Sequence, residues 1–167
     1  MFVLGIDPGV SRCGYALVKR QGSVSQVHGL GVITTPTDWP LPQRLALLQK
    51  ELSELFDSFS PSVLAIERVL FQANVRTALS VGQASGLAMV EAARRQLPVA
   101  EYSPNQVKDA VVGYGAATKA QVQRMVQTIL SLDAPPRPAD AADAAAVALC
   151  HLAHAPSVAA IRRTLDR

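Results

Sequence analysis

The sequence predicts an α/β protein: a three-layer sandwich around a five-stranded mixed sheet, with three antiparallel strands first and parallel strands after them. Up to Thr34 the chain consists of short β-rich segments separated by turns. Beyond that point, segments with the 3.6-residue period of a helix alternate with apolar runs of strand length. This order is typical of a sheet that is covered by helices on both faces.

The first three strands are expected at residues 1–7, 14–18 and 24–34. Asp7-Pro8-Gly9 should end the first strand, because Pro suits the second position of a turn and Gly tolerates a positive φ. Two further strands are expected at 62–67 and 99–102. The first three should form an antiparallel meander.

Helices are expected where apolar residues recur on one face or where capping residues occur. A stripe of Leu and Phe at i, i+4 and i+7 predicts a helix over 41–59, and a second helix with several small residues is expected over 74–96. Ser103-Pro104-Asn105-Gln106 and Thr118-Lys119-Ala120-Gln121 both have the capping-box pattern of a helix start. A Pro-rich break over 134–138 precedes a last helix that begins near Ala139.

The composition indicates one compact domain, which we expect to occupy residues 1–156, followed by a basic C-terminal tail at 157–167 that need not be ordered. The chain has no apolar run of about 20 residues and no leader-like start, so we expect a soluble cytoplasmic protein without a membrane partner. Cys13 and Cys150 lack the spacing of a zinc site and should be reduced thiols. The net charge of +3 favours a nucleic-acid partner only weakly.

Four of the thirteen acids stand out by position. Asp7 and Glu67 are each the first acid after an apolar strand, so they should lie at the same sheet edge if these strands are parallel neighbours. Asp140 and Asp143 are three residues apart at the start of a helix that is otherwise apolar nearly all round. Two interpretations are open. In one, Asp140 is the N-cap and Asp143 lies in the first turn, where both suit the helix dipole; in the other, both acids belong to a partly buried site.

If the four carboxylates converge, they repel one another, and a divalent cation is the natural counter-ion. Oxygen ligands suit magnesium or manganese rather than zinc, and a two-metal carboxylate site can hydrolyse phosphodiester bonds. No GxSxG elbow, Walker loop or complete GxGxxG is present, and His28, His151 and His154 have no clear catalytic context.

Together, four segments resemble the RuvC family of Holliday-junction resolvases, which belong to the RNase H-like superfamily. They are GIDPGVSRCGYALV at 5–18, AIERVLFQANVRTALSVGQASG at 65–86, VKDAVVGYGAATKAQVQRMV at 107–126 and DAADAAAVALCH at 140–151. The resemblance implies an RNase H-like fold and a homodimeric endonuclease that nicks two like strands of a four-way DNA junction. It also implies two Mg²⁺ ions, for which Mn²⁺ can substitute, held by Asp7, Glu67, Asp140 and Asp143, and a branch-migration motor complex as a partner.

The resemblance also places Lys108 and Lys119 near the DNA backbone, with Lys119 in the catalytic site. Lys119 at the first helical position opposes the helix dipole, which a bound phosphate would compensate; an exposed, mobile lysine is the alternative. Arg12 and Arg76 are further candidates for phosphate contacts. The family often has an aromatic three residues after the glutamate, where this chain has Leu70 and then Phe71, so either could contact an unstacked base at the junction.

The helix over 74–96 is the candidate dimer interface, because Gly82 and Gly86 would allow a partner helix to approach closely; packing against their own sheet is the alternative. Two other functions stay open from the residues alone. One is an RNase H-like nuclease that acts on RNA. The other is an actin-like nucleotide-binding protein, although those proteins clasp ATP between two domains and this chain has room for one.

Overall fold

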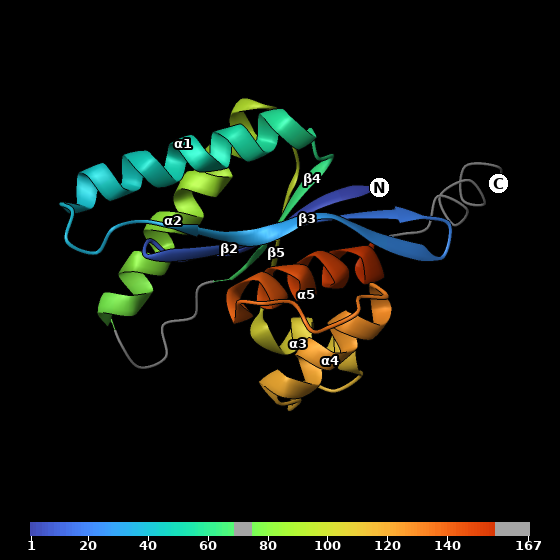
Figure 1. Ribbon diagram of the computed structural model, residues 1–167. Helices are drawn as coiled ribbons and strands as arrows, with labels where there is room; N and C mark the ends of the chain where they lie inside the picture. Colours follow the sequence, from blue (N-terminus) through green and yellow to red (C-terminus); the bar gives the residue numbers. More distant parts are fainter. Residues whose placement is uncertain (69–74, 156–167) are drawn as a thin grey trace.

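The computed structural model describes residues 1–68 and 75–155 of the chain (Figure 1). The elements in chain order are β1 (Phe2–Asp7), β2 (Arg12–Gln21), β3 (Val24–Thr34), α1 (Leu41–Phe59), β4 (Val63–Glu67), α2 (Val75–Arg94), β5 (Val99–Tyr102), α3 (Pro104–Val112), α4 (Lys119–Ile129) and α5 (Ala139–His154).

The strands form one mixed sheet in the order β3-β2-β1-β4-β5. The β1–β2 and β2–β3 pairs are antiparallel, whereas β4 runs parallel to both β1 and β5. The predicted sheet is therefore confirmed. The expected second strand was too short, because β2 hydrogen-bonds to β3 along its whole length, from Arg12 opposite Thr34 to Gln21 opposite Val24.

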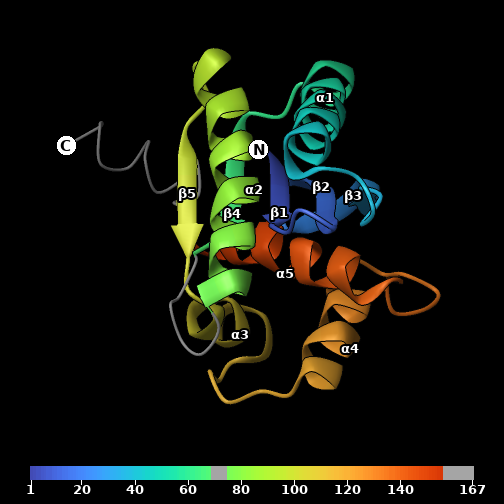
Figure 2. The same ribbon diagram turned by 90° about the vertical axis from the view of Figure 1, so that its left-hand side faces the viewer.

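Helices cover both faces of the sheet, as Figure 2 shows in a view turned by 90°. Helices α1 and α2 pack on one face, where Leu48, Leu52 and Phe56 of α1 join buried strand residues such as Leu4 and Leu64. Helix α5 covers the other face, and α3 and α4 pack against its far side. The three-layer sandwich predicted from the sequence is thus present.

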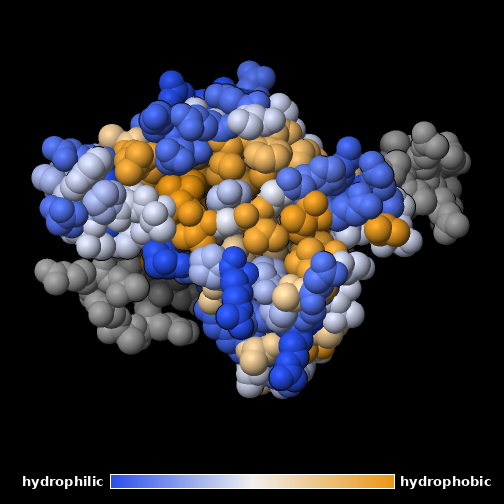
Figure 3. Space-filling view, in the orientation of Figure 1, coloured by the Kyte–Doolittle hydropathy of each residue, from blue (hydrophilic) through white to orange (hydrophobic). Residues whose placement is uncertain are grey.

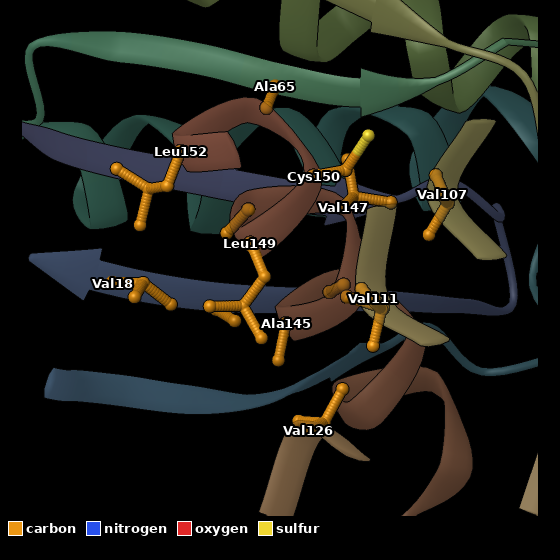
Figure 4. Close-up of a cluster of buried hydrophobic side chains, with 14 of the residues drawn as sticks. Val18, Ala65, Val107, Val111, Val126, Ala145, Val147, Leu149, Cys150 and Leu152 are labelled. Carbon is orange, nitrogen blue, oxygen red and sulfur yellow. The ribbon is translucent and has the colours of Figure 1, made fainter. Parts of the chain in front are cut away.

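Helix α5 is buried all round from Ala144 to Cys150, where its sequence is entirely apolar. Figure 4 shows Ala145, Val147 and Leu149 between the strands and the valines of α3 and α4. The helix lies unusually close to the sheet at two glycines: a Cβ on Gly5 would lie 2.2 Å from the Ala144 carbonyl oxygen, and one on Gly14 would lie 2.1 Å from that of Asp140. Glycine at these positions therefore fixes where α5 crosses β1 and β2.

The two capping boxes are confirmed. The Ser103 and Thr118 side chains accept hydrogen bonds from the amides of Gln106 and Gln121, and both glutamine side chains accept in return from the cap amides. The N-cap reading of Asp140 is wrong: α5 begins after Pro138, without a side-chain cap, and Asp140 is its second residue. Asp140 is therefore free to bond elsewhere.

Two surface features concern partners. A Cβ on Gly82 or Gly86 would meet no atom within 4 Å, so the alternative that these glycines pack against their own sheet is wrong. An apolar strip between α1 and β3, visible in Figure 3, includes a shallow hollow lined in part by Val32, Leu47 and Leu55. Among the described helices, none combines the length and apolar character that a membrane crossing requires.

Candidate active site

Asp7 and Glu67 lie side by side at one edge of the sheet. In β1, Val3 packs on the α5 face and Leu4 and Ile6 on the opposite face, so strand alternation turns Asp7 toward α5. Alternation in β4 does the same for Glu67. Because Ile6 and Ile66 are paired in the parallel register, Asp7 and Glu67 are the next residues along adjacent strands.

Asp140 and Asp143 reach the same edge from the start of α5. The contact between Gly14 and the Asp140 backbone seats this end of the helix on β2, directly opposite Asp7 in the β1–β2 register. The charges of Asp143, Glu67 and Asp140 all raise the pKa of Asp7. The four acids, which come from three separate elements, are therefore within electrostatic range of one another.

The acid cluster is under electrostatic strain in the absence of a cation. Burial, followed by the charges of its three acidic neighbours, raises the pKa of Asp7 from 3.8 to about 7. Burial and the charge of Asp143 also raise the pKa of Glu67. A site that disfavours its own ionised carboxylates in this way favours a bound positive charge.

Two basic side chains neutralise part of this charge. The Lys119 ammonium lies 2.6 Å from Asp143 Oδ2, and this contact raises the pKa of Lys119. Arg12 donates from Nε and Nη2 to Asp140 Oδ2, at 3.0 and 2.8 Å, and these hydrogen bonds lower the pKa of Asp140. Lys119 opposes the dipole of α4 from the first turn of that helix. The negative charge that compensates it here is the carboxylate of Asp143.

A pocket of about 260 Å³ opens beside the acids. Its polar lining is Glu67, Asp143, Lys108 and Lys119, and its apolar lining is Pro104, Val107, Val122 and Ala146. Carboxylates and lysines in one pocket suit a ligand that carries phosphate together with a metal cation.

The donor set fits a divalent cation that prefers oxygen, because it offers carboxylates alone. Within residues 1–68 and 75–155, however, no three His, Cys, Asp or Glu side chains lie close enough together to hold a metal ion as they stand. In this arrangement Arg12 engages Oδ2 of Asp140 and Lys119 engages Oδ2 of Asp143.

The other predicted DNA contacts have no described side chains. Leu70, Phe71 and the tail at 157–167 lie outside the described residues, and Arg76 belongs to α2 but its side chain is not described.

The histidines and cysteines have structural contacts. His151 bonds to the Tyr102 hydroxyl at 2.8 Å, His154 bonds to the Cys150 carbonyl, and His28 contacts the ring of Phe2. Both Cys13 and Cys150 are buried free thiols, as predicted.

Sequence reasoning missed how the loop after β1 is built. The Ser11 carbonyl accepts from the Thr35 amide, the Thr35 hydroxyl donates to the Val10 carbonyl, and Arg44 of α1 donates to the hydroxyls of Ser11 and Thr35. These contacts join residues up to 33 positions apart, so no local pattern could reveal them. The Arg12–Asp140 pair, 128 positions apart, was missed for the same reason.

Comparisons with known proteins agree with this geometry. The family model described as crossover junction endodeoxyribonuclease RuvC matches residues 3–151. A RuvC from Streptomyces avermitilis is 49% identical over 158 residues, which cover 94% of this chain and 90% of that protein.

Solved structures of Thermus thermophilus RuvC match as well. The protein alone has a TM-score of 0.86 and 35% identity, covering 92% of this chain and 95% of that chain. The complex of T. thermophilus RuvC with a Holliday junction substrate has a TM-score of 0.84 and 33% identity, covering 92% and 94%. These structures confirm the fold class, and the family model spans most of the chain, so the chain belongs to the RuvC family of crossover junction endodeoxyribonucleases.

Proposed function

We propose that this protein is an endonuclease that resolves four-way DNA junctions by nicking two like strands symmetrically. The observation that carries the proposal is the convergence of Asp7, Glu67, Asp140 and Asp143 at one sheet edge, beside a pocket with two lysines. A related protein with 33% identity has been solved with a Holliday junction substrate, which supports the same class of DNA for this chain.

In this proposal the four carboxylates hold two Mg²⁺ ions, and Mn²⁺ can replace them. When bound, divalent cations activate water and stabilise the leaving oxygen in phosphodiester hydrolysis. The protein's own part is to aim the carboxylates from a rigid sheet edge and helix start. Burial and the charges of the neighbouring acids raise the pKa of Asp7, so a bound cation would stabilise its ionised form.

Lys119 and Lys108 are the proposed contacts to the DNA backbone. Both lysines line the same pocket as Glu67 and Asp143, where they can bind a phosphate next to the carboxylates. Arg12, Arg76, Leu70 and Phe71 are proposed as further DNA contacts. Lys119 contacts Asp143 in this structure, and a phosphate that drew its ammonium away would free that carboxylate for a metal ion.

We also propose a homodimer formed through α2, since a two-fold junction needs two equivalent active sites. Gly82 and Gly86 face open space, and Leu79 and Val90 on the same helix are 61% and 51% exposed. Large exposed apolar residues beside glycines suit a closely packed partner helix. From the family resemblance we further propose a branch-migration motor complex as a partner and the cytoplasm as the place of action.

The test is cleavage of three labelled substrates in MgCl₂: a four-way junction, a linear duplex and an RNA hairpin. We expect paired nicks in the junction alone, and no cleavage by Asp7→Asn although that variant still binds the junction. Cleavage of the hairpin alone would favour the RNA-directed alternative, whereas nucleotide binding without any cleavage would favour the actin-like one. Normal cleavage by Asp7→Asn would remove Asp7 from the proposed site.

A further inference from the structure

We propose that Arg12 is an internal counter-ion that competes with divalent cations for Asp140 in the DNA-free protein. This inference rests on the proposed metal site and adds a residue that regulates its loading. Arg12 donates twice to a single oxygen, Oδ2 of Asp140, so it engages the carboxylate through two charge-assisted hydrogen bonds. A cation that takes this oxygen must displace both donors.

The pair is built into rigid backbone on both sides. A Cβ on Gly9 would lie 2.4 Å from the Arg12 carbonyl oxygen, so the turn from Gly9 to Arg12 is tightly closed. Ser11 is tied to Thr35 and Arg44, which hold this turn against the start of α1. Asp140 is seated on Gly14 through its own backbone. Arg12 and Asp140 therefore face each other without depending on a mobile segment.

The exposure of the pair leaves it able to exchange partners. The Arg12 side chain is 49% exposed and that of Asp140 is 29% exposed, so solvent and ions reach both. A half-exposed ion pair stabilises a protein only modestly, which means that a cation can outcompete it. Without the pair, Asp140 would add an uncompensated negative charge to a cluster that already raises the pKa of Asp7.

This role predicts effects of opposite sign for one substitution. Arg12→Gln removes the competitor, so the variant should bind Mn²⁺ about two- to fivefold more tightly than the wild type. The same change leaves the acid cluster less compensated, so the metal-free variant should unfold at a lower urea concentration. A purely structural role for Arg12 predicts losses in both measurements.

The experiment is isothermal titration calorimetry of the DNA-free protein with MnCl₂, together with urea unfolding in EDTA. Arg124→Gln is the matched control, because it removes an exposed arginine of α4 and changes the net charge equally. A double-mutant cycle with Asp140→Asn tests whether Arg12 acts through Asp140. In the Asp140→Asn background, Arg12→Gln should no longer change the Mn²⁺ affinity.

Tighter binding by Arg12→Gln that disappears in the Asp140→Asn background supports the inference. It is overturned if Arg12→Gln and Arg124→Gln change the affinity equally, or if the gain persists without the Asp140 charge. If Asp140→Asn itself abolishes binding, the opposite signs of affinity and stability in Arg12→Gln decide. Absence of Mn²⁺ binding to the wild type would instead refute the proposed metal site, and the inference with it.

Discussion

Replacing Asp7 with Asn should stabilise the metal-free protein at alkaline pH while it abolishes the proposed activity. The pKa of Asp7 in the folded protein is about 7, compared with 3.8 as the ordinary value. The folded state therefore binds the Asp7 proton more tightly than the unfolded state. Between these two values each rise of one pH unit costs the folded state about 1.4 kcal/mol, and the loss is complete above pH 7.

The magnitude follows from the size of the shift. The difference between the two pKa values, 3.8 and about 7, corresponds to a loss of stability of roughly 4 kcal/mol at most, which is absent near pH 4 and complete at pH 8. Asp7→Asn has no charge to desolvate and no proton to lose. The stability difference between the variant and the wild type should therefore grow in favour of the variant by about 2 to 3 kcal/mol between pH 5 and pH 8.

The assay is urea unfolding followed by circular dichroism in EDTA at several pH values. Asp38→Asn is the matched control, because Asp38 is exposed in the turn before α1. The difference in free energy of unfolding between Asp38→Asn and the wild type should stay constant over this pH range. A difference between Asp7→Asn and the wild type that stays constant from pH 5 to pH 8 would refute the reasoning. Addition of MgCl₂ at pH 8 should stabilise the wild type and not the variant.

Three further substitutions test other parts of the structure. Lys119→Ala should slow junction cleavage and lower the slope of log Kd for the junction against log salt by about one, measured by fluorescence anisotropy; an unchanged slope would argue against a phosphate contact. Gly14→Ala should lower the free energy of unfolding by about 1 to 3 kcal/mol and reduce cleavage, because the new Cβ displaces Asp140 without touching its carboxylate; wild-type stability would mean that α5 can shift freely. Ser103→Ala should lower the free energy of unfolding in urea by about 1 kcal/mol, because the capping box of α3 loses the hydrogen bond that Ser103 accepts; an unchanged free energy of unfolding would mean that the cap does not stabilise the protein.

The sequence was most informative where structure depends on neighbouring residues. The helix over 41–59 and the strand over 99–102 were predicted with their observed bounds, because a regular apolar stripe and two close turns define them. Both capping boxes were also predicted, since four consecutive residues contain the whole motif. Asp7 and Glu67 were predicted to lie at the same edge of the sheet because each follows an apolar strand, and the parallel pairing of β1 with β4 agrees with this.

Prediction failed where distant residues decide the outcome. The N-cap rule suggested a local role for Asp140, but Arg12 lies 128 positions away and takes this carboxylate instead. The need for glycine at positions 5 and 14 could not be predicted from the strand sequences. It arises because the alanine-rich helix α5 crosses the strands in contact with Gly5 and Gly14. The predicted second strand was too short for the same reason: the polar residues at its two ends belong to β2 because they pair with neighbouring strands.

The burial of α5 bears on how the acid cluster moves. This helix lies between the sheet and the α3–α4 pair, and ten of its sixteen residues are buried. Its backbone amides should therefore be among the slowest in the protein to exchange with deuterated solvent, because they open only when the whole molecule unfolds. Asp140 and Asp143 stand near the start of this buried helix, so we expect the site to adjust to its substrate through side-chain rotamers rather than through movement of α5.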